Sequence, residues 1–376
     1  MILPAVSGRP ARIDQVVPSL GRRDAVGVHV LYLRDLLRRR GFASDIWVQG
    51  VFPELRTEAR LVADLPDTPR PGTWWLYHLA VGSPLADRLA ARGEPLLVDY
   101  HNVTPAKLLG HWLPWATESA ELGERQVAAL APRTAFAVAD STWNERDLVA
   151  AGYRRTAVAP PLFDTAARVP DPDTLARRHA ERVPGELRWL FVGRLAPNKA
   201  QHDLVKALVC AERFLGLRCR LDLVGTGLGE RYPSAVRQLA QRAGMADRVH
   251  LAGMVDDEVL AAYYATADVF VSASDHEGFG IPLVEAMAAG LPVVAYDAGA
   301  VAETVGDGGL VVADKAPLAL ATAVRRVAAD EELRRRLVAS GYRRAAALSR
   351  RAIEARWSAV IDDAVREVAG SLQGAA

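Results

Sequence analysis

The segment 272–290 constrains the fold of this chain more than any other stretch. It reads Ser-Ala-Ser-Asp-His-Glu-Gly-Phe-Gly-Ile-Pro-Leu-Val-Glu-Ala-Met-Ala-Ala-Gly. Proline favours the first positions of a helix and glycine the position after its end, so we expect a helix over about 282–289, closed by Gly290. Apolar runs on either side, at 268–272 and 291–295, predict buried strands. The pattern is therefore a strand, a glycine turn, a helix and a second strand.

Two glutamates of this segment are expected to face an anion site. A glycine turn between a strand and a helix places free backbone N–H groups and the positive end of the helix dipole at the carboxyl edge of a sheet. Glu277 lies in the turn, and Glu285 is expected to point back toward the same pocket, because helical side chains lean toward the N-terminus. A sugar nucleotide, with both phosphates and hydroxyls, suits this combination. The alternative is a surface acid and a glutamate that complements the helix dipole.

The sequence Glu277-Gly-Phe-Gly-Ile-Pro-Leu-Val-Glu285 resembles the E-x7-E element of the retaining glycosyltransferases of family 4, which have the GT-B fold. The resemblance implies an α/β protein with two Rossmann-like, doubly wound domains that face each other across a cleft. It assigns Glu277 to the hydroxyls of the donor sugar and Glu285 to the ribose. It also assigns donor binding to the turn and helix residues Gly278, Phe279, Gly280, Ile281 and Leu283.

The composition predicts a globular protein of two domains. The chain has 376 residues, 50% hydrophobic and 24% charged, and its formal net charge of +1 argues against a dedicated nucleic-acid binder. Cys210 and Cys219 are too few for a disulfide framework, so we expect both to be core thiols in a reducing compartment. The sequence shows no long apolar run and no signal-peptide pattern at 1–9, which predicts a cytoplasmic protein.

The first half has the strand–loop–helix–strand pattern of a doubly wound sheet. We expect strands at 12–17 and 44–48 and a helix at 28–40, where apolar residues recur at helical spacing. In the family, the loop before this helix approaches the donor or the acceptor. Asp24 and Gly27 of this loop are therefore candidates for the acceptor side, although a cap of the helix is the favoured interpretation of Asp24.

Two histidines follow the next pair of predicted strands, 74–78 and 95–102. Ligands of open α/β sheets bind at the carboxyl ends of strands. By resemblance, His101 hydrogen-bonds the transferred sugar, and Asn102 beside it belongs to the acceptor side. His78 resembles a second wall of the cleft, with a structural role as the equal alternative.

An apolar and aromatic segment occupies residues 107–115. A packed helix is the favoured interpretation, because exposed apolar patches are uncommon. The alternative is a surface that binds the acceptor, or that makes a peripheral membrane contact if the acceptor is a lipid.

Arg194 and Lys199 form the second candidate element of the donor site. They follow a predicted strand at 187–192 and lie five positions apart with a turn between them, so both side chains can face one diphosphate. The alternative is two solvated loop cations. Gly193-Arg-Leu followed by this lysine resembles the donor-diphosphate element of family 4, with Ala200 where the family has glycine.

Glycines at two later strand ends are expected to line the nucleotide. Gly225 belongs to a glycine turn after a predicted strand at 220–224, which resembles only half of a dinucleotide fingerprint. By resemblance, the backbone of Gly253, Met254 and Val255 faces the base.

The chain is expected to divide into two domains joined by a linker rich in Pro, Asp and Arg at 164–185. The acceptor-binding domain is residues 1–163 with a returning C-terminal helix, 352–376, and the donor-binding domain is residues 164–351. In GT-B proteins the last helix crosses back onto the first domain, and Trp357 and Val360 are the apolar positions expected to make that contact.

The resemblance implies that a hexosyl group moves, with retention, from a UDP- or GDP-sugar to a hydroxyl of a glycan, lipid or small molecule. The expected catalytic residues are Arg194, Lys199, Glu277 and His101. No metal or other cofactor is implied, because the two cations and the turn amides neutralise the leaving diphosphate. The alternatives are a nucleotide-sugar epimerase, a trehalose-synthase-like condensing enzyme and a non-catalytic sugar-nucleotide-binding protein. The donor sugar, its base, the acceptor and the oligomeric state are not assigned by the sequence.

Overall fold

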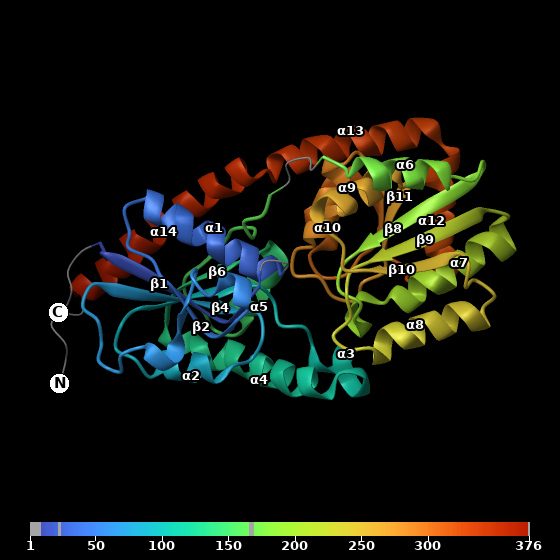
Figure 1. The fold of residues 1–376 in the computed structure, drawn as a ribbon. Helices are drawn as coiled ribbons and strands as arrows, with labels where there is room; N and C mark the ends of the chain where they lie inside the picture. The colour runs from blue at the N-terminus through green and yellow to red at the C-terminus, as the bar shows by residue number, and fades with distance from the viewer. Residues whose placement is uncertain (1–8, 22–23, 165–168, 375–376) are drawn as a thin grey trace. The chain divides into compact units, whose positions relative to one another are not determined.

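The computed structural model describes residues 9–21, 24–164 and 169–374 (Figure 1). Arg22 and Arg23 of the predicted substrate loop, residues 1–8 of the N-terminal segment and 165–168 of the predicted linker lie outside the described residues. The chain forms two compact α/β units. Unit 1 is Met1–Ala106, Trp115–Asp164 and Arg350–Ala376, and unit 2 is Lys107–Pro114 and Thr165–Ser349.

The described strands of unit 1 form one parallel sheet. Its seven strands run in the order β3-β2-β1-β4-β5-β6-β7, so that the chain winds outward from β1 in both directions. The side chains of β4 and β5 are all buried, as expected for strands covered on both faces. The strands are β1 Arg12–Leu20, β2 Ile46–Val51, β3 Arg60–Leu61, β4 Thr73–Leu79, β5 Leu96–Tyr100, β6 Thr134–Ala139 and β7 Thr156–Val158.

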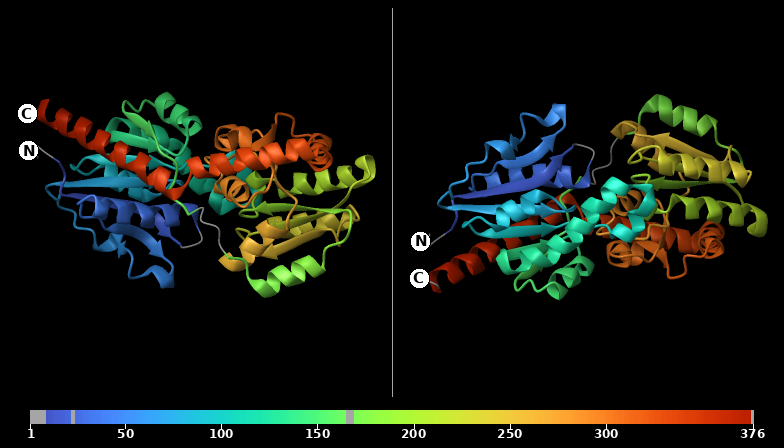
Figure 2. Two further views of the ribbon diagram at one scale, coloured as in Figure 1. Left: turned by 90° about the horizontal axis from the view of Figure 1, so that it is seen from above. Right: turned by 90° about the horizontal axis from the view of Figure 1, so that it is seen from below.

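Helices flank this sheet on both faces, which the two views of Figure 2 show. α1 and α14 pack on one face, and α2, α4 and α5 pack on the other. The capping prediction for Asp24 is confirmed, because its carboxylate accepts a hydrogen bond from the Gly27 N–H at the start of α1. The helices are α1 Ala25–Arg39, α2 Pro84–Ala90, α4 Pro114–Leu130, α5 Thr142–Ala150 and α14 Arg350–Gly374. The short helix α3 Ala106–Leu109 belongs, except for its first residue, to unit 2.

The last helix, α14, is tied to unit 1 by a buried tryptophan. The Trp357 side chain is 1% exposed, and its indole N–H donates to the Pro160 carbonyl at 2.8 Å. Val360 is also buried. Both apolar contacts predicted for this helix are therefore present.

Unit 2 is built on a second parallel sheet, whose six described strands run in the order β10-β9-β8-β11-β12-β13. Its core includes the fully buried Trp189, whose ring is covered by apolar residues from neighbouring strands and helices. The strands are β8 Glu186–Val192, β9 Arg218–Val224, β10 Val249–Gly253, β11 Val269–Ser272, β12 Val293–Tyr296 and β13 Gly309–Val312. The helices are α6 Pro172–Ala180, α7 Gln201–Leu215, α8 Arg231–Arg242, α9 Asp257–Thr266, α10 Ile281–Ala288, α11 Val301–Val305, α12 Pro317–Ala329 and α13 Glu331–Ala347.

Part of the aromatic segment 107–115 belongs to unit 2. The Trp112 ring meets the Tyr232 ring edge-on with centroids 5.6 Å apart, and the Arg231 guanidinium lies 5.9 Å from the Trp112 ring centroid. The neighbouring Trp115 is 61% exposed. The prediction of a packed segment therefore holds for Trp112, whereas Trp115 faces solvent.

The structure corrects several predicted boundaries. Residues 18–20, expected to be loop, continue β1, although one of them is Pro18. β1 pairs with β4 only up to Val16 and beyond it with β2 alone, so that the missing proline N–H removes no hydrogen bond on the β4 side. The helix α1 begins at Ala25, not at Val28. Within the described part of the chain, no helix is both long enough and apolar enough to span a membrane.

Candidate functional site

The loops that follow β8 and β11 are held together in unit 2. The Asp275 N–H donates to the Asn198 carbonyl at 2.8 Å, and Lys199 Nζ lies 2.7 Å from Glu277 Oε1. The side chains of this ion pair are 23% and 13% exposed. Two of the residues predicted from separate motifs, Lys199 and Glu277, are therefore in direct contact.

A small cavity lies at this contact. It is bounded by the ends of β8 and β11 and by the first turn of α10. It brings together the predicted residues Gly193, Lys199, Glu277, Gly280 and Leu283 with Phe191, Val192, Phe270, Ser272 and Pro282. A cation and a carboxylate thus face one concave surface beside a helix N-terminus, which can bind a phosphate group and a hydroxyl at the same time.

The turn that carries Glu277 is fixed by the loop after β12 and by the helix α11 that follows it. The Glu277 carbonyl accepts from the Ala300 N–H at 2.9 Å, and the Thr304 hydroxyl donates to the Phe279 carbonyl at 2.6 Å. Gly280, the N-cap of α10, has a φ of 91°, a value that L side chains rarely adopt. The turn is therefore held in one shape before any ligand binds.

The supply of backbone donors at the start of α10 is smaller than the sequence suggested. Pro282 carries no N–H, and the Leu283 N–H donates to the Gly280 carbonyl at 3.0 Å. The Ile281 position is the first of the helix. We expected the Leu283 N–H to bind the donor, but this internal hydrogen bond already uses it. The Leu283 side chain does line the cavity.

Glu285 is not among the residues that line the cavity, in contrast to the expectation that it points into the same pocket as Glu277. It is the fifth residue of α10, and its Oε2 accepts a hydrogen bond from the Tyr264 hydroxyl at 2.9 Å. Tyr264 belongs to α9, and its ring stacks on Phe270 with centroids 6.3 Å apart. The sequence showed Tyr264 only as part of a packed helix, and nothing in the local pattern linked it to Glu285.

The glycines predicted to line the nucleotide lie at neighbouring strand ends. A Cβ built on Gly225 would lie 2.1 Å from the Gly193 carbonyl oxygen, and the Gly225 N–H donates to the Gly253 carbonyl at 2.9 Å. Met254, which follows, is 59% exposed, and Val255 is half-buried. These glycines therefore have a packing role besides any contact with a ligand.

Two further residues belong to the loops that carry the ion pair. Arg194 is exposed, and its carbonyl accepts from the Gln201 side-chain amide at 2.9 Å, which fixes the loop toward α7. Burial, opposed by the charge of Glu277, lowers the pKa of His276, so this imidazole is neutral at pH 7. The sequence analysis did not select His276, although it adjoins Glu277.

In unit 1, the loop residues predicted for the acceptor side have structural roles. Gly27 packs against the backbone of Gly21, whose carbonyl oxygen would lie 2.1 Å from an added Cβ. Asn102 has a φ of 68°, and its side-chain amide donates to Asn144 Oδ1 at 2.8 Å. Asn102 is therefore held in the left-handed region by a buried side-chain hydrogen bond.

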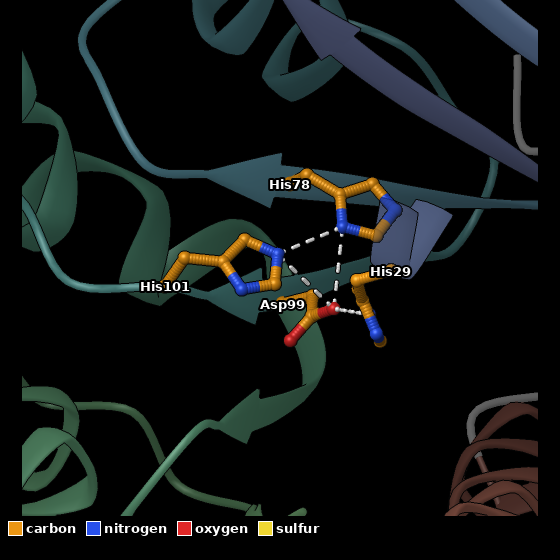
Figure 3. A group of neighbouring side chains, drawn as sticks. All are labelled: His29, His78, Asp99 and His101. Atoms are coloured by element: carbon orange, nitrogen blue, oxygen red, sulfur yellow. Dashed lines mark hydrogen bonds and ion pairs between the residues drawn. The ribbon is translucent and has the colours of Figure 1, made fainter. Parts of the chain in front are cut away.

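His78 and His101 belong to a buried polar cluster at the carboxyl ends of β4 and β5 (Figure 3). His78 of β4 and Asp99 of β5 are register partners on adjacent strands, so their side chains leave the sheet on the same face. His29 of α1 and His101, just after β5, complete the group. One ring nitrogen of each of the three histidines and one Asp99 oxygen lie within 4.8 Å of one another, so this group could hold a metal ion.

Electrostatics distinguishes the two predicted histidines. Burial lowers the pKa of His78 to about 4, which keeps it neutral. Burial alone would also lower the pKa of His101, but the carboxylates of Asp140 and Asp99 outweigh it and raise that pKa to about 9. Both ring nitrogens of His101 face partners inside unit 1, and its side chain is 3% exposed.

Residues 174–344, which lie in unit 2, match the family model described as glycosyl transferases group 1. The D-inositol 3-phosphate glycosyltransferase of Geodermatophilus obscurus is 36% identical over 251 residues, which are 65% of this chain and 54% of that protein. The enzyme of the same name from Frankia alni is 33% identical over 263 residues, 68% of this chain and 63% of that protein. The chain thus spans between half and two thirds of the length of these curated relatives.

Solved structures resemble the chain over both units. The Anabaena protein HepE, in complex with UDP and glucose, has a TM-score of 0.75 at 19% identity and covers 94% of this chain and all of its own. Sucrose-phosphate synthase from Thermosynechococcus elongatus has a TM-score of 0.73 at 22% identity and covers 94% of this chain and 98% of its own. Identities this low bear on the fold alone. The chain has the GT-B fold, and its residues 174–344 match the family model of the glycosyl transferases group 1.

Proposed function

We propose that this chain is a retaining glycosyltransferase that moves a hexosyl group from a nucleoside diphosphate sugar to an acceptor hydroxyl. The observation that carries the proposal is the contact between Lys199 and Glu277 at the cavity beside the N-terminus of α10. A cation for phosphate and a carboxylate for sugar hydroxyls stand side by side, as a sugar joined to a diphosphate requires.

Donor binding replaces the internal ion pair with two new contacts. Lys199, aided by Arg194, takes the diphosphate, and Glu277 accepts hydrogen bonds from the hydroxyls of the sugar. As the bond from the sugar to the phosphate breaks, negative charge grows on the leaving diphosphate, where Lys199 is already in place. Such preorganised stabilisation is usually the largest catalytic contribution. The leaving phosphate accepts the acceptor's proton on the same face of the sugar, and neither Glu277 nor Glu285 acts as a nucleophile.

The choice of substrates to test first comes from the similar proteins. HepE is in complex with UDP and glucose, and the curated relatives are named for D-inositol 3-phosphate. We therefore propose UDP-glucose as the first donor and D-inositol 3-phosphate as the first acceptor, with GDP-mannose as a donor that carries a different base.

The experiment has two stages. Thermal-shift measurements with UDP and GDP identify the base, because a ligand that binds only the folded state raises the melting temperature. Incubation of the matching sugar nucleotide with a panel of acceptors is then followed by mass spectrometry and by proton NMR of the anomeric signal. A product with the donor's anomeric configuration supports the proposal. An inverted product, an epimerised free donor, or binding of nucleotide without any transfer across the panel would each refute it.

A further inference from the structure

The histidine cluster of unit 1 has a hydrogen-bond pattern that fixes the protonation of each ring. The Leu162 N–H donates to His29 Nδ1 at 2.8 Å, so this nitrogen carries a lone pair. The proton of neutral His29 is then on Nε2, which donates to Asp99 Oδ2 at 2.8 Å. Because its Nε2 is a donor, His29 supports Asp99 and is not itself a metal ligand.

The tautomer of His78 is fixed in the same way. The Gln15 side-chain amide donates to the Val30 carbonyl at 3.1 Å, which leaves its oxygen to accept from His78 Nε2 at 2.9 Å. The lone pair of His78 is therefore on Nδ1. That nitrogen lies 3.0 Å from His101 Nε2 and 3.2 Å from Asp99 Oδ2 (Figure 3).

His101 is oriented by the second buried carboxylate. Its Nδ1 lies 3.1 Å from both oxygens of Asp140, so this nitrogen carries a proton and donates it. Its Nε2 faces inward, 3.4 Å from Asp99 Oδ2. An imidazole whose outer N–H is held by a carboxylate is the usual arrangement of a metal-binding histidine.

Three potential ligand atoms therefore lie close to one another. His78 Nδ1, His101 Nε2 and Asp99 Oδ2 are separated from one another by 3.0, 3.2 and 3.4 Å. Ligands at about 2.0–2.1 Å from a tetrahedral zinc ion are separated by roughly 3.3 Å. A proton on His101 Nε2 is an incomplete substitute for the metal ion. A single N–H would then have to serve two neighbouring acceptors, His78 Nδ1 and Asp99 Oδ2.

The charge of the cluster also favours a divalent cation. Asp99 and Asp140 are buried carboxylates, and the Asp99 Oδ1 atom has no hydrogen-bond partner among the described residues. With a divalent cation the charges cancel, which matters because uncompensated buried charge is costly.

We propose that unit 1 binds one Zn²⁺ ion through His78 Nδ1, Asp99 Oδ2 and His101 Nε2, with water as the fourth ligand. The mixture of two imidazoles and one carboxylate suits zinc. When the ion binds, the proton on His101 Nε2 leaves to solvent. Gln15, Asp140 and His29 then orient the three ligands, and the ion joins the carboxyl ends of β4 and β5. This site does not rest on the proposed transferase activity.

The test is a metal-binding measurement on the full-length chain after removal of any affinity tag. Protein produced in zinc-supplemented medium is expected to contain about one zinc per chain by plasma mass spectrometry. The His78→Gln and Asp99→Asn variants should lose it. The His29→Gln variant changes the residue that orients Asp99, so it should weaken zinc affinity by about 10- to 100-fold without abolishing binding. The control is His250→Gln, which removes another histidine–aspartate contact, to Asp222, in unit 2.

A second readout needs no variant and no activity. Replacement of zinc by Co²⁺ in the wild-type chain should give the visible absorption bands of a tetrahedral site with nitrogen and oxygen ligands. The ¹⁵N shifts of His78 and His101 should be those of neutral, metal-bound rings. Substoichiometric zinc with no response to added Zn²⁺, or ¹⁵N shifts of a protonated His101 in the presence of Zn²⁺, would overturn the proposal whatever the chain's transferase activity. Equal zinc content in wild type and His78→Gln would do the same.

Discussion

Lys199 Nζ lies 2.7 Å from Glu277 Oε1, although the two residues are 78 positions apart in the chain. The contact joins the loop after β8 to the loop after β11, which are neighbouring strands of the unit 2 sheet. It places the positive charge and the hydroxyl-binding carboxylate of the proposed donor site at one cavity. Most of the predictions below concern how this pair is used and how it is kept in place.

Removal of either cation should affect turnover far more than folding. We expect Lys199→Ala and Arg194→Ala to lower kcat by about a hundred- to thousand-fold, the usual effect of losing one group that stabilises charge in the transition state. The melting temperature should change little, because both side chains are at least partly exposed. Lys206→Ala is the matched control, since Lys206 forms only an exposed ion pair with Asp203. Near-normal kcat in both test variants would contradict the phosphate assignment.

Transfer should not depend on magnesium. Lys199 and Arg194 supply the positive charge that a metal ion would otherwise bring to the diphosphate. The rate in buffer without added divalent cations should therefore equal the rate with Mg²⁺, measured by product formation. The comparison needs no chelator, so the zinc ion proposed for unit 1 stays in place. Activation by Mg²⁺ of about tenfold or more, which is 1.4 kcal/mol of transition-state stabilisation, would argue against this assignment.

Tyr264 is expected to position Glu285 for the ribose. Tyr264→Phe removes the 2.9 Å hydrogen bond and leaves the ring stacked on Phe270. Hydrogen bonds to charged groups contribute about 1.5–3 kcal/mol, so the dissociation constant for the nucleoside diphosphate should rise by about tenfold or more. Isothermal titration calorimetry measures it, with Tyr263→Phe, the adjacent residue of α9, as the control. Equal affinity in both variants would show that Tyr264 serves packing alone.

Gly225→Ala should destabilise unit 2 through its backbone. The new Cβ would lie 2.1 Å from the Gly193 carbonyl oxygen, at a φ of 135°. Gly244→Ala is the control, because Gly244 has a φ of 75° but open space around its Cβ. Overpacking usually costs about 1–3 kcal/mol, and we expect that difference between the two variants in urea unfolding. If both variants lost a similar amount of unfolding free energy, the ends of β8 and β9, which Gly193 and Gly225 follow, would be able to move apart without cost.

The two cysteines should differ in reactivity. Burial in the unit 2 core, with the negative charge of Glu212 nearby, raises the pKa of the Cys219 thiol to about 12. The thiolate is the reactive form, so Cys219 should resist Ellman's reagent at pH 8 in the native chain. Cys210 is only half-buried, and we expect it to react. Denatured protein should give both thiols, and native Cys210→Ser protein should give none; a fast native reaction in that variant would contradict the burial of Cys219.

Much of the architecture could be predicted because its determinants are local. Apolar strands, the proline and glycine that bound α10, and the Asp24 cap are read from neighbouring residues. Several elements were not predicted, including α2, α8, α12 and β13. The end of β1 was missed because its pairing changes along the strand, and no local pattern shows which neighbour a strand will have.

The sequence by itself determined the family resemblance, the two parallel-sheet units and the candidate pair Lys199 and Glu277. Short spacings and turn residues encode these features. Only the tertiary structure decided that Glu285 is held by Tyr264 and that His78 and His101 meet Asp99 within 3.4 Å. The physical reason is strand register, because β4 and β5 place His78 beside Asp99. Hydrogen bonds that Gln15 and Asp140 accept and that the Leu162 N–H donates then set which nitrogen of each ring faces inward. Contacts of this kind depend on the assembled sheet.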